Sequence, residues 1–342
     1  MGTRRGQRIA YVGIDVSKDK LNVAWRVRDG ERLEFEIPND ADGHAEIIRR
    51  VTAGRIAEAR VAFEATGPYS TVLLLNLSKA QKVRAARLRP AQARAYAKAI
   101  GPRGKTDVLD ARILCDMAAR PDFTPTDVPE LERLQLQAMA RELEALINTR
   151  ASMNMRRQSA TAAGGLSDAF NDLLGGVHAA IDEAIAKMEL ELERRIKADP
   201  KTAEFYDRAD SLQGFARRSL VQIIPELAAA PQTLTPRQMV AFAGFDPRPK
   251  KSGSSRAGES WSISKMGSRR LRRMLYVCAR VAVRWHPPSR AYYEAMLARN
   301  KPRMVALVAV ARKLLVALWV MWTRGVDFDP SAFTGRWSPD SA

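Results

Sequence analysis

Cysteine and histidine are scarce in this chain, whose 342 residues include two cysteines and three histidines. Cys115 and Cys278 lie far apart in apolar stretches, and neither has a partner at metal-ligand spacing. A disulfide framework and a zinc site are therefore not expected. Because His44, His178 and His286 are scattered, as ordinary surface or core residues are, none of them is a candidate general base.

The chain also lacks a long uninterrupted apolar run. The N-terminal stretch MGTRRGQRIAYVGID is too short in apolar residues for a signal peptide, and Gly6 stands where a myristoylation signal has Ser or Thr. The longest apolar segment, 305–322, is interrupted by Arg312 and Lys313, which favours a buried helix over a membrane span. We expect a protein of the reducing cytoplasm with no membrane partner.

Acidic residues are outnumbered, with 38 Asp and Glu against 56 Lys and Arg, which gives a formal net charge of +18. A charge this large on a chain that is 46% hydrophobic predicts a folded protein with a polyanionic partner, most commonly nucleic acid. A ribosomal-type basic protein fits the composition as well. The length predicts two domains and a connector, because single cores rarely grow to this size.

Residues 1–128 predict a mixed α/β domain. Apolar runs predict strands at 9–16, 21–27 and 33–37, with Asp29-Gly30 as a hairpin turn. Helices and strands then alternate, with helices at 42–51, 70–82, 90–100 and 106–119 and strands at 60–65 and 83–88. Three antiparallel strands followed by this alternation are typical of a ribonuclease-H-like α/β fold.

Residues 129–200 predict long helices. Apolar residues recur at spacings of three, four or seven, which indicates a helical hairpin turned at Gly164-Gly165 or at Gly175-Gly176. Packing on the same chain and an intermolecular coiled coil fit this periodicity equally well. Residues 201–333 predict a mainly α-helical C-terminal domain, and the short polar segment 334–342 predicts a mobile tail.

Four carboxylates in the first domain occupy unusual positions. Asp15 interrupts the apolar strand YVGIDVS, where an unpaired carboxylate is costly to bury, and Glu64 ends a strand before a Gly-Pro turn. Asp107 and Asp110 are three residues apart, so both point from one helix face.

Each of these acids has an ordinary explanation, as a turn residue, an ion-paired residue or a partner of a helix dipole. In a ribonuclease-H-like sheet, however, the four would meet. Together they predict a site for two Mg²⁺ ions about 4 Å apart, with Mn²⁺ as an alternative, as used in phosphodiester cleavage.

The stretch PKKSGSSRAG, residues 249–258, places three serines between basic residues. One hydroxyl could act as a nucleophile, with the nearby positive charges stabilising a phosphorane; a loop that only binds phosphate fits equally. Side-chain chemistry alone does not choose among Ser252, Ser254 and Ser255. The charges are those of Lys250, Lys251 and Arg256.

A basic helix is predicted from Ser268 onward. Positive charge is unfavourable at a helix N-terminus, so a bound phosphate is one explanation of its arginines, and a solvated face is the other. The arginines are Arg269, Arg270, Arg272 and Arg273. The nearby aromatic residues favour core positions, with a tyrosine nucleophile as an alternative.

Segments along the chain resemble the DEDD transposases of insertion sequences of the 110 and 1111 types. They are YVGIDVSKDKLNV, FEATGPY, GKTDVLDARIL, AFAGFDPRPKKSGSSRAG and SRRLRRMLYVCA. The resemblance runs from about Arg8 to Phe328. It implies a RuvC-like domain at 1–128, a coiled-coil connector at 129–200 and a C-terminal transposase domain at 201–333.

The same resemblance implies DNA recombination in the nucleoid of a bacterial or archaeal cell. A noncoding bridge RNA would pair with donor and target double-stranded DNA. The protein would be a homo-oligomer, a dimer or a tetramer, in which the serine of one subunit meets the acids of another.

The acidic set of the family falls on Asp15, Glu64, Asp107 and Asp110, and its nucleophilic serine on Ser252, which would form a 5′-phosphoserine link. Two departures are visible. Ala216 replaces the second glycine of a Pro-Gly-x-Gly hairpin that clamps phosphate, and Gly104 stands where relatives tend to have a polar residue. A RuvC-like metal-dependent junction nuclease without a covalent intermediate and a non-catalytic RNA-binding protein are the alternatives.

Overall fold

The computed structural model contains two compact units, residues 1–128 and 129–342, each with its own core. The predicted 129–200 and 201–333 regions both lie in the second unit. The residues that the structure describes are 8–27, 30–100, 107–128, 130–165, 167–250 and 260–333. Asp29, Gly104 and the predicted tail 334–342 fall outside them.

The first unit is built on a five-stranded mixed sheet with strand order β3-β2-β1-β4-β5. β1 pairs antiparallel with β2 and parallel with β4, and β2–β3 is antiparallel whereas β4–β5 is parallel. The strands are β1 (Arg8–Val16), β2 (Lys20–Val27), β3 (Leu33–Pro38), β4 (Ile56–Glu64) and β5 (Val83–Leu88). The prediction of three antiparallel strands before an alternation is confirmed.

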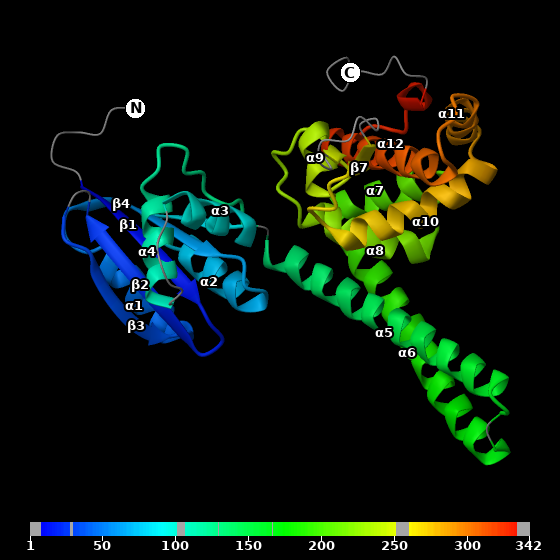
Figure 1. Ribbon diagram of the computed structural model, residues 1–342, viewed down its shortest axis with the longest axis horizontal. Coiled ribbons are helices and arrows are strands. Elements are labelled where there is room, and N and C mark those ends of the chain that lie inside the picture. The colour runs from blue at the N-terminus through cyan, green and yellow to red at the C-terminus, as the bar shows by residue number, and fades with distance from the viewer. Residues whose placement is uncertain are drawn as a thin grey trace. The chain divides into compact units, whose positions relative to one another are not determined.

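Helices cover both faces of this sheet (Figure 1). One face packs Ile14 and Phe63 in a core cluster with Ile47 and Leu77, which come from α1 and α2. The other face packs against α4, through Ala111 and Cys115. The helices of this unit are α1 (Ala41–Val51), α2 (Pro68–Ser78), α3 (Pro90–Ile100) and α4 (Asp107–Ala118).

Two predicted boundaries in the first unit are wrong. β4 begins at Ile56, four residues before the expected strand, because Ala59 and Val61 are already paired in the centre of the sheet. α2 runs over 68–78 rather than 70–82, since Gly67 provides a positive φ of 73° before a proline at the first helical position. Residues 79–82 then form the turn into β5.

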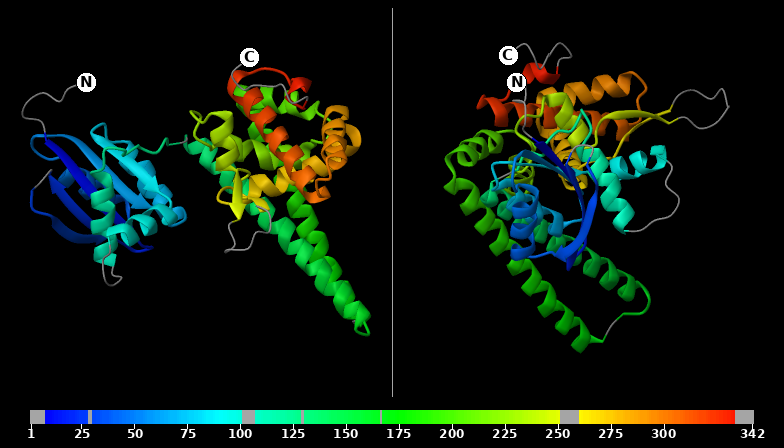
Figure 2. Two further views of the ribbon diagram at one scale, coloured as in Figure 1. Left: turned by 45° about the horizontal axis from the view of Figure 1, so that its top comes forward. Right: turned by 90° about the vertical axis from the view of Figure 1, so that its left-hand side faces the viewer.

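The second unit begins with two long antiparallel helices, α5 (Leu131–Ala162) and α6 (Asp168–Ala198), which extend away from the other helices of the unit (Figures 1 and 2). Of the two predicted turns, the one at Gly164-Gly165 is confirmed, with φ values of 118° and 87°, whereas Gly175-Gly176 lies inside α6. An ion pair between Arg150 and Asp182 joins the helices across 2.5 Å. The N-terminal half of α5 contributes Leu136, Ala140 and Leu143 to the core of the unit.

Seven shorter helical elements complete the second unit, and α8 is almost entirely buried among them. They are α7 (Pro200–Asp210), α8 (Arg217–Ala228), α9 (Pro236–Phe242), α10 (Arg269–Trp285), α11 (Pro287–Ala298), α12 (Arg303–Arg324) and the 3₁₀ turn η1 (Pro330–Phe333). By length and composition α12 could cross a membrane, but 56% of its most apolar stretch is buried. The prediction of a buried helix at 305–322 is confirmed.

A short hairpin, β6 (Pro247–Lys250) and β7 (Ser260–Ile263), was not predicted. It flanks the segment 251–259, which lies outside the described residues. Backbone hydrogen bonds fix its base, from Ser264 to Asp246 at 2.8 Å and from Ser268 to Phe242 at 3.0 Å. The base of the hairpin that carries the serine segment is thereby held at the N-terminus of α10.

Candidate active site

Small residues form a flat floor where α4 crosses the sheet. Gly13 of β1 is paired with Ala24 on β2 and Ala62 on β4, so the three lie side by side on one face. A Cβ on Gly13 would stand 2.1 Å from the backbone O of Ala111 and 2.1 Å from the backbone N of Cys115. Only a glycine therefore lets α4 lie this close to β1.

A row of polar residues follows this floor, two positions further along each strand. Asp15 is paired with Asn22 on β2, and Glu64 follows the last parallel pair between β1 and β4, Ile14 with Phe63. Because alternate residues share a face, Asp15 and Glu64 lie on the α4 side, on strands about 4.8 Å apart. Both acids are partly exposed at the carboxyl ends of parallel strands, where sites form in α/β sheets.

The direction of α4 brings its first turn to this polar row. The thiol of Cys115 donates a hydrogen bond to the carbonyl of Tyr11 at 3.3 Å, whereas Ala111 lies over Gly13. The helix therefore runs antiparallel to β1. One turn earlier, Asp107 is about 6 Å along the helix axis from Ala111, and Asp15 is about 6.6 Å along β1 from Gly13.

The side chain of Asp107 lies outside what the structure describes, whereas Asp110 is partly exposed in the first turn of α4. The backbone thus places Asp107 toward the end of the floor that carries Asp15 and Glu64, whereas Asp110 directly precedes Ala111, which lies over Gly13.

Ion pairs fasten α4 to the edge of the sheet. Asp116 lies 2.6 Å from Arg32 and 3.3 Å from Arg26, and Arg112 donates to Glu34 on β3 at 2.9 Å. The hydrogen bond and charge of Arg112 lower the pKa of Glu34 below its ordinary value. These contacts set the rotation of α4, and hence the direction in which its first turn faces.

Two residues that the sequence did not single out complete the row. Asn22 is 9% exposed, and its Nδ2 has no hydrogen-bond partner among the described residues; the Oγ1 of Thr66, two residues after Glu64, is likewise buried without one. A buried polar atom without a partner costs about 1–3 kcal/mol, so such atoms often mark a place for a ligand or water. Only the register of β1 and β2 reveals that Asn22 is adjacent to Asp15.

The donor set at this edge fits a hard divalent cation, because carboxylate oxygens are the ligands that Mg²⁺ prefers. Among the side chains that the structure describes, no group of three or more acidic, histidine or cysteine residues is close enough to hold a metal ion. The side chains of Asp15, Glu64 and Asp110 are among those described, whereas that of Asp107 is not. The metal site thus stays a prediction.

The predicted nucleophile loop lies mainly outside the described residues. The parts of the prediction that fall outside are Lys251, Ser252, Ser254, Ser255 and Arg256, together with the side chain of Lys250. The hairpin on either side of it is described, and its base is braced by Arg272, which donates to the carbonyl of Ala243 at 2.6 Å. Burial is the main cause that lowers the pKa of Arg272, with the charge of Arg269 adding to it.

Two other arginines of α10, Arg270 and Arg273, have partners on α5. Arg270 lies 2.5 Å from Glu144, and Arg273 donates to Glu144 at 3.1 Å and to Asn148 at 2.6 Å. Within the described part of the chain, Arg269 has no ion-pair partner. Positive charge at a helix N-terminus is unfavourable unless an anion lies nearby. For two of the four arginines, the chain itself provides that anion. Contact of these arginines with nucleic acid stays a prediction.

The segment that replaces the glycine-rich clamp packs against α10. Gly214 has a φ of 119°, and a Cβ there would stand 2.9 Å from the Cβ of Ala282. Ala216 follows as the N-cap of α8, with its backbone N donating to Ser219 Oγ at 3.0 Å. The remaining glycine is therefore required for helix packing.

Comparison with known proteins places both units in one family. A model of DEDD transposases of IS110 elements matches residues 12–160, and the model described as "Transposase IS116/IS110/IS902 family" matches residues 206–294. The chain belongs to the IS110 family of DEDD transposases. The first match contains the floor, the polar row and α4, and the second contains the serine segment and all of α10.

Individual relatives agree with this assignment. The chain is 23% identical to the pilin gene-inverting protein of Moraxella bovis over 328 residues, which cover 93% of this chain and 97% of the relative. It is 25% identical to a probable family 20 transposase of Pseudomonas aeruginosa over 66% of this chain and 74% of the relative. It is 24% identical to the transposase of element IS1328 of Yersinia enterocolitica over 66% of this chain and 73% of the relative. This IS110-family transposase is thus an enzyme that acts on DNA.

Proposed function

We propose that this transposase cuts and rejoins the DNA of an insertion sequence through Ser252 and a carboxylate site at Asp15, Glu64, Asp107 and Asp110. The observation that carries the proposal is the polar row at the end of the small-residue floor, onto which α4 brings its first turn. The strand order and the placement of α4 also support the assignment of a ribonuclease-H-like, RuvC-like unit.

The covalent step conserves the bond energy of the phosphodiester. The Ser252 Oγ–P bond forms as the P–O3′ bond breaks, and the serine proton is transferred overall to the departing 3′ oxygen. The products are a free 3′-hydroxyl and a 5′-phosphoserine. Attack by another 3′-hydroxyl reverses these changes and rejoins the strands. A hydroxyl at its ordinary pKa is a weak nucleophile and needs activation.

The carboxylates would hold one or two Mg²⁺ ions, which stabilise negative charge on the reacting phosphate oxygens when bound. The neighbouring residues orient what enters the site. Asn22 presents a buried N–H donor beside Asp15, and Thr66 presents a hydroxyl beside the end of β4. Phosphate oxygens or ordered waters at that edge, one for each atom, would satisfy them.

The partners are a noncoding bridge RNA and donor and target DNA. Support for them comes from the family and from the net charge of +18, which favours binding of polyanions. A homo-oligomer is supported by the outer part of the α5–α6 hairpin, where Met155, Phe170 and Leu173 are 69%, 50% and 69% exposed. Apolar residues this exposed on paired helices are typical of a coiled-coil contact between subunits.

The experiment that tests the function combines the protein, Mg²⁺, RNA transcribed from the flank of its gene, and labelled donor and target DNA. The expected product on a denaturing gel is DNA covalently attached to the protein with the wild-type chain, and none with Ser252→Ala. Free cleaved DNA without an adduct would instead identify a junction nuclease. Binding of RNA without any cleavage would identify a non-catalytic RNA-binding protein.

We expect Asn22→Leu to stabilise the first unit while it impairs the reaction. The nearly isosteric apolar side chain removes an unpaired buried amide, which adds about 1–3 kcal/mol to the free energy of unfolding. Loss of a donor to a charged group lowers the rate of strand cleavage by about ten- to a hundredfold. Thermal unfolding and a cleavage time course measure the two effects.

Asn76→Leu is the matched control, because the Nδ2 of Asn76 is hydrogen-bonded to His44 Nδ1 at 2.8 Å. This substitution removes a satisfied amide, so it should destabilise the unit and leave the cleavage rate unchanged once the protein is folded. The role of Asn22 is refuted if Asn22→Leu destabilises the unit as Asn76→Leu does and cleaves at the wild-type rate.

A further inference from the structure

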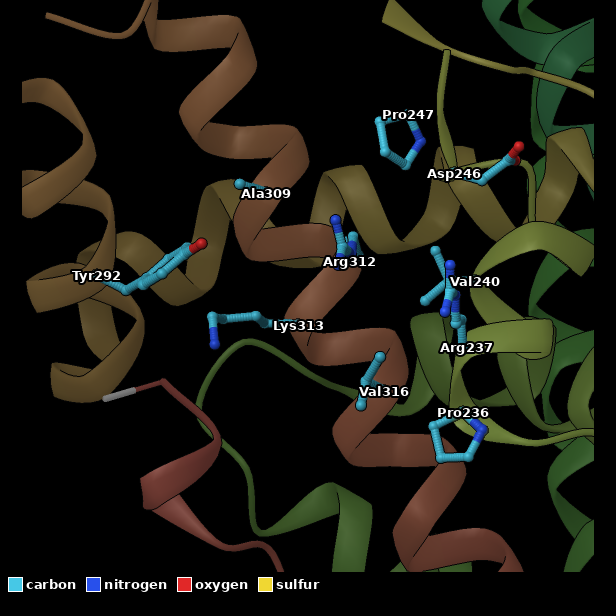
Figure 3. Close-up of a pocket in the computed structure, with 10 residues that line it drawn as sticks. All are labelled: Pro236, Arg237, Val240, Asp246, Pro247, Tyr292, Ala309, Arg312, Lys313 and Val316. Carbon is cyan, nitrogen blue, oxygen red and sulfur yellow. The ribbon is translucent and has the colours of Figure 1, made fainter. Parts of the chain in front are cut away.

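A basic pocket of about 700 Å³ lies in the second unit. α12 crosses it, with Arg312 and Lys313 between Tyr292 of α11 on one side and Arg237 of α9 on the other (Figure 3). The pocket is also lined by Pro236, Val240, Asp246, Pro247, Ala309 and Val316. Its volume is in the range of ligand-binding pockets, about 300–1,000 Å³.

The positive charge of this pocket is not balanced within the described part of the chain. Arg237 and Arg312 are exposed, and neither has an ion-pair or hydrogen-bond partner among the described residues. The one carboxylate of the lining, Asp246, accepts a hydrogen bond from Ser264 and lies 3.9 Å from Arg248. Two guanidinium groups that share a pocket without an anion indicate that the anion comes from a ligand.

Lys313 also lines the pocket, and aromatic rings lie against its ammonium group. Its Nζ lies 4.8 Å from the ring centre of Tyr292 and 5.9 Å from that of Phe333. Burial lowers the pKa of Lys313, and the charge of Arg312 lowers it further. An anion in the pocket would relieve this repulsion.

We propose that the pocket binds the phosphodiester backbone of a nucleic-acid strand, with Arg237 and Arg312 each contacting a phosphate. Guanidinium groups bind phosphate oxygens through paired N–H donors, and they read no sequence there. Asp246 and Pro247 connect the rim of the pocket to β6, which leads into the serine segment. A strand bound in this pocket would thus be guided toward the base of that hairpin. DNA and RNA present the same backbone, and the experiment separates them.

The test measures the affinity of the full-length double variant Arg237→Ala/Arg312→Ala over a range of salt concentrations. One probe is duplex DNA of random sequence, and the other is single-stranded RNA of the same length. Loss of two phosphate contacts should reduce the slope of log K against log[salt] by about 1.8 for duplex DNA or about 1.4 for a single strand. The probe whose slope changes is the ligand. The measurement needs no cleavage, so it fails independently of the proposed catalytic function.

A charge-matched control is provided by Arg299→Ala/Arg303→Ala. Arg303 is nine residues before Arg312 on α12, about two and a half turns, so it lies on the opposite face of the helix. This control should keep the wild-type slope, and Arg237→Lys/Arg312→Lys should keep most of it. Slopes unchanged for both probes in the alanine variant, or reduced equally in the control, would overturn the proposal.

Discussion

Asp15→Asn should lower the rate of DNA strand cleavage by about a thousandfold. A carboxylate that holds a divalent cation provides several kcal/mol of stabilisation to the transition state, and each 1.36 kcal/mol corresponds to about tenfold in rate. The asparagine keeps the shape of the side chain but not its charge, and Asp15 is only partly buried at the end of β1. Thermal unfolding should therefore change little while cleavage is lost.

Asp19→Asn serves as the control for this substitution. Asp19 is an exposed acid in the turn between β1 and β2, four residues after Asp15, so the two variants have the same change in net charge. The control should cleave at the wild-type rate. If both variants cleave alike in saturating Mg²⁺, Asp15 does not belong to the active site.

Gly13→Ala should destabilise the first unit by on the order of 3 kcal/mol and abolish cleavage. The new Cβ would meet the backbone of α4 at 2.1 Å, and a helix backbone cannot rotate away as a side chain can. The only relief is displacement of α4, which carries Asp107 and Asp110 away from β1. Hydrogen exchange in peptides from β1 and α4, measured in increasing urea, reports the loss of stability locally.

Gly175→Ala is the control for this substitution, and it should raise stability rather than lower it. Gly175 lies inside α6, and a Cβ there would meet no atom within 4 Å. Alanine should therefore stabilise that helix by about 0.5–1 kcal/mol. For Gly13→Ala, the contradicting result is hydrogen exchange of α4 at the wild-type rate. It would show that α4 does not pack against β1 as described.

Local patterns predicted most of the secondary structure. The bounds of β5 and α3 were predicted to the residue, because Pro90 marks the start of the helix directly after an apolar strand. The apolar pattern places the start of β4 too late, because Glu58 and Arg60 interrupt it. The strand is nevertheless central and is paired on both sides. The short β6–β7 hairpin was missed because four-residue strands beside Pro, Gly and Ser give little periodic signal.

The candidate site was predictable only in part. Asp15 is a candidate because it interrupts an apolar strand, and Glu64 because it ends one. Asn22 has no such signal, since its importance depends on pairing with Asp15. The role of Gly13 likewise depends on a helix that comes about a hundred residues later. For α10, the helix dipole suggests a bound phosphate, whereas the structure shows that Glu144 of α5 lies against Arg270 and Arg273.

The central claim is that Ser252 forms the covalent bond to DNA, and peptide mass spectrometry tests it most directly. Trypsin cleaves after Lys251 and Arg256, so the trapped complex should release the peptide SGSSR, residues 252–256. After nuclease treatment, the account predicts a nucleotide mass on this peptide, assigned by fragmentation to Ser252. Attachment to Ser254, Ser255 or a tyrosine, or efficient cleavage with no modified peptide, would contradict it.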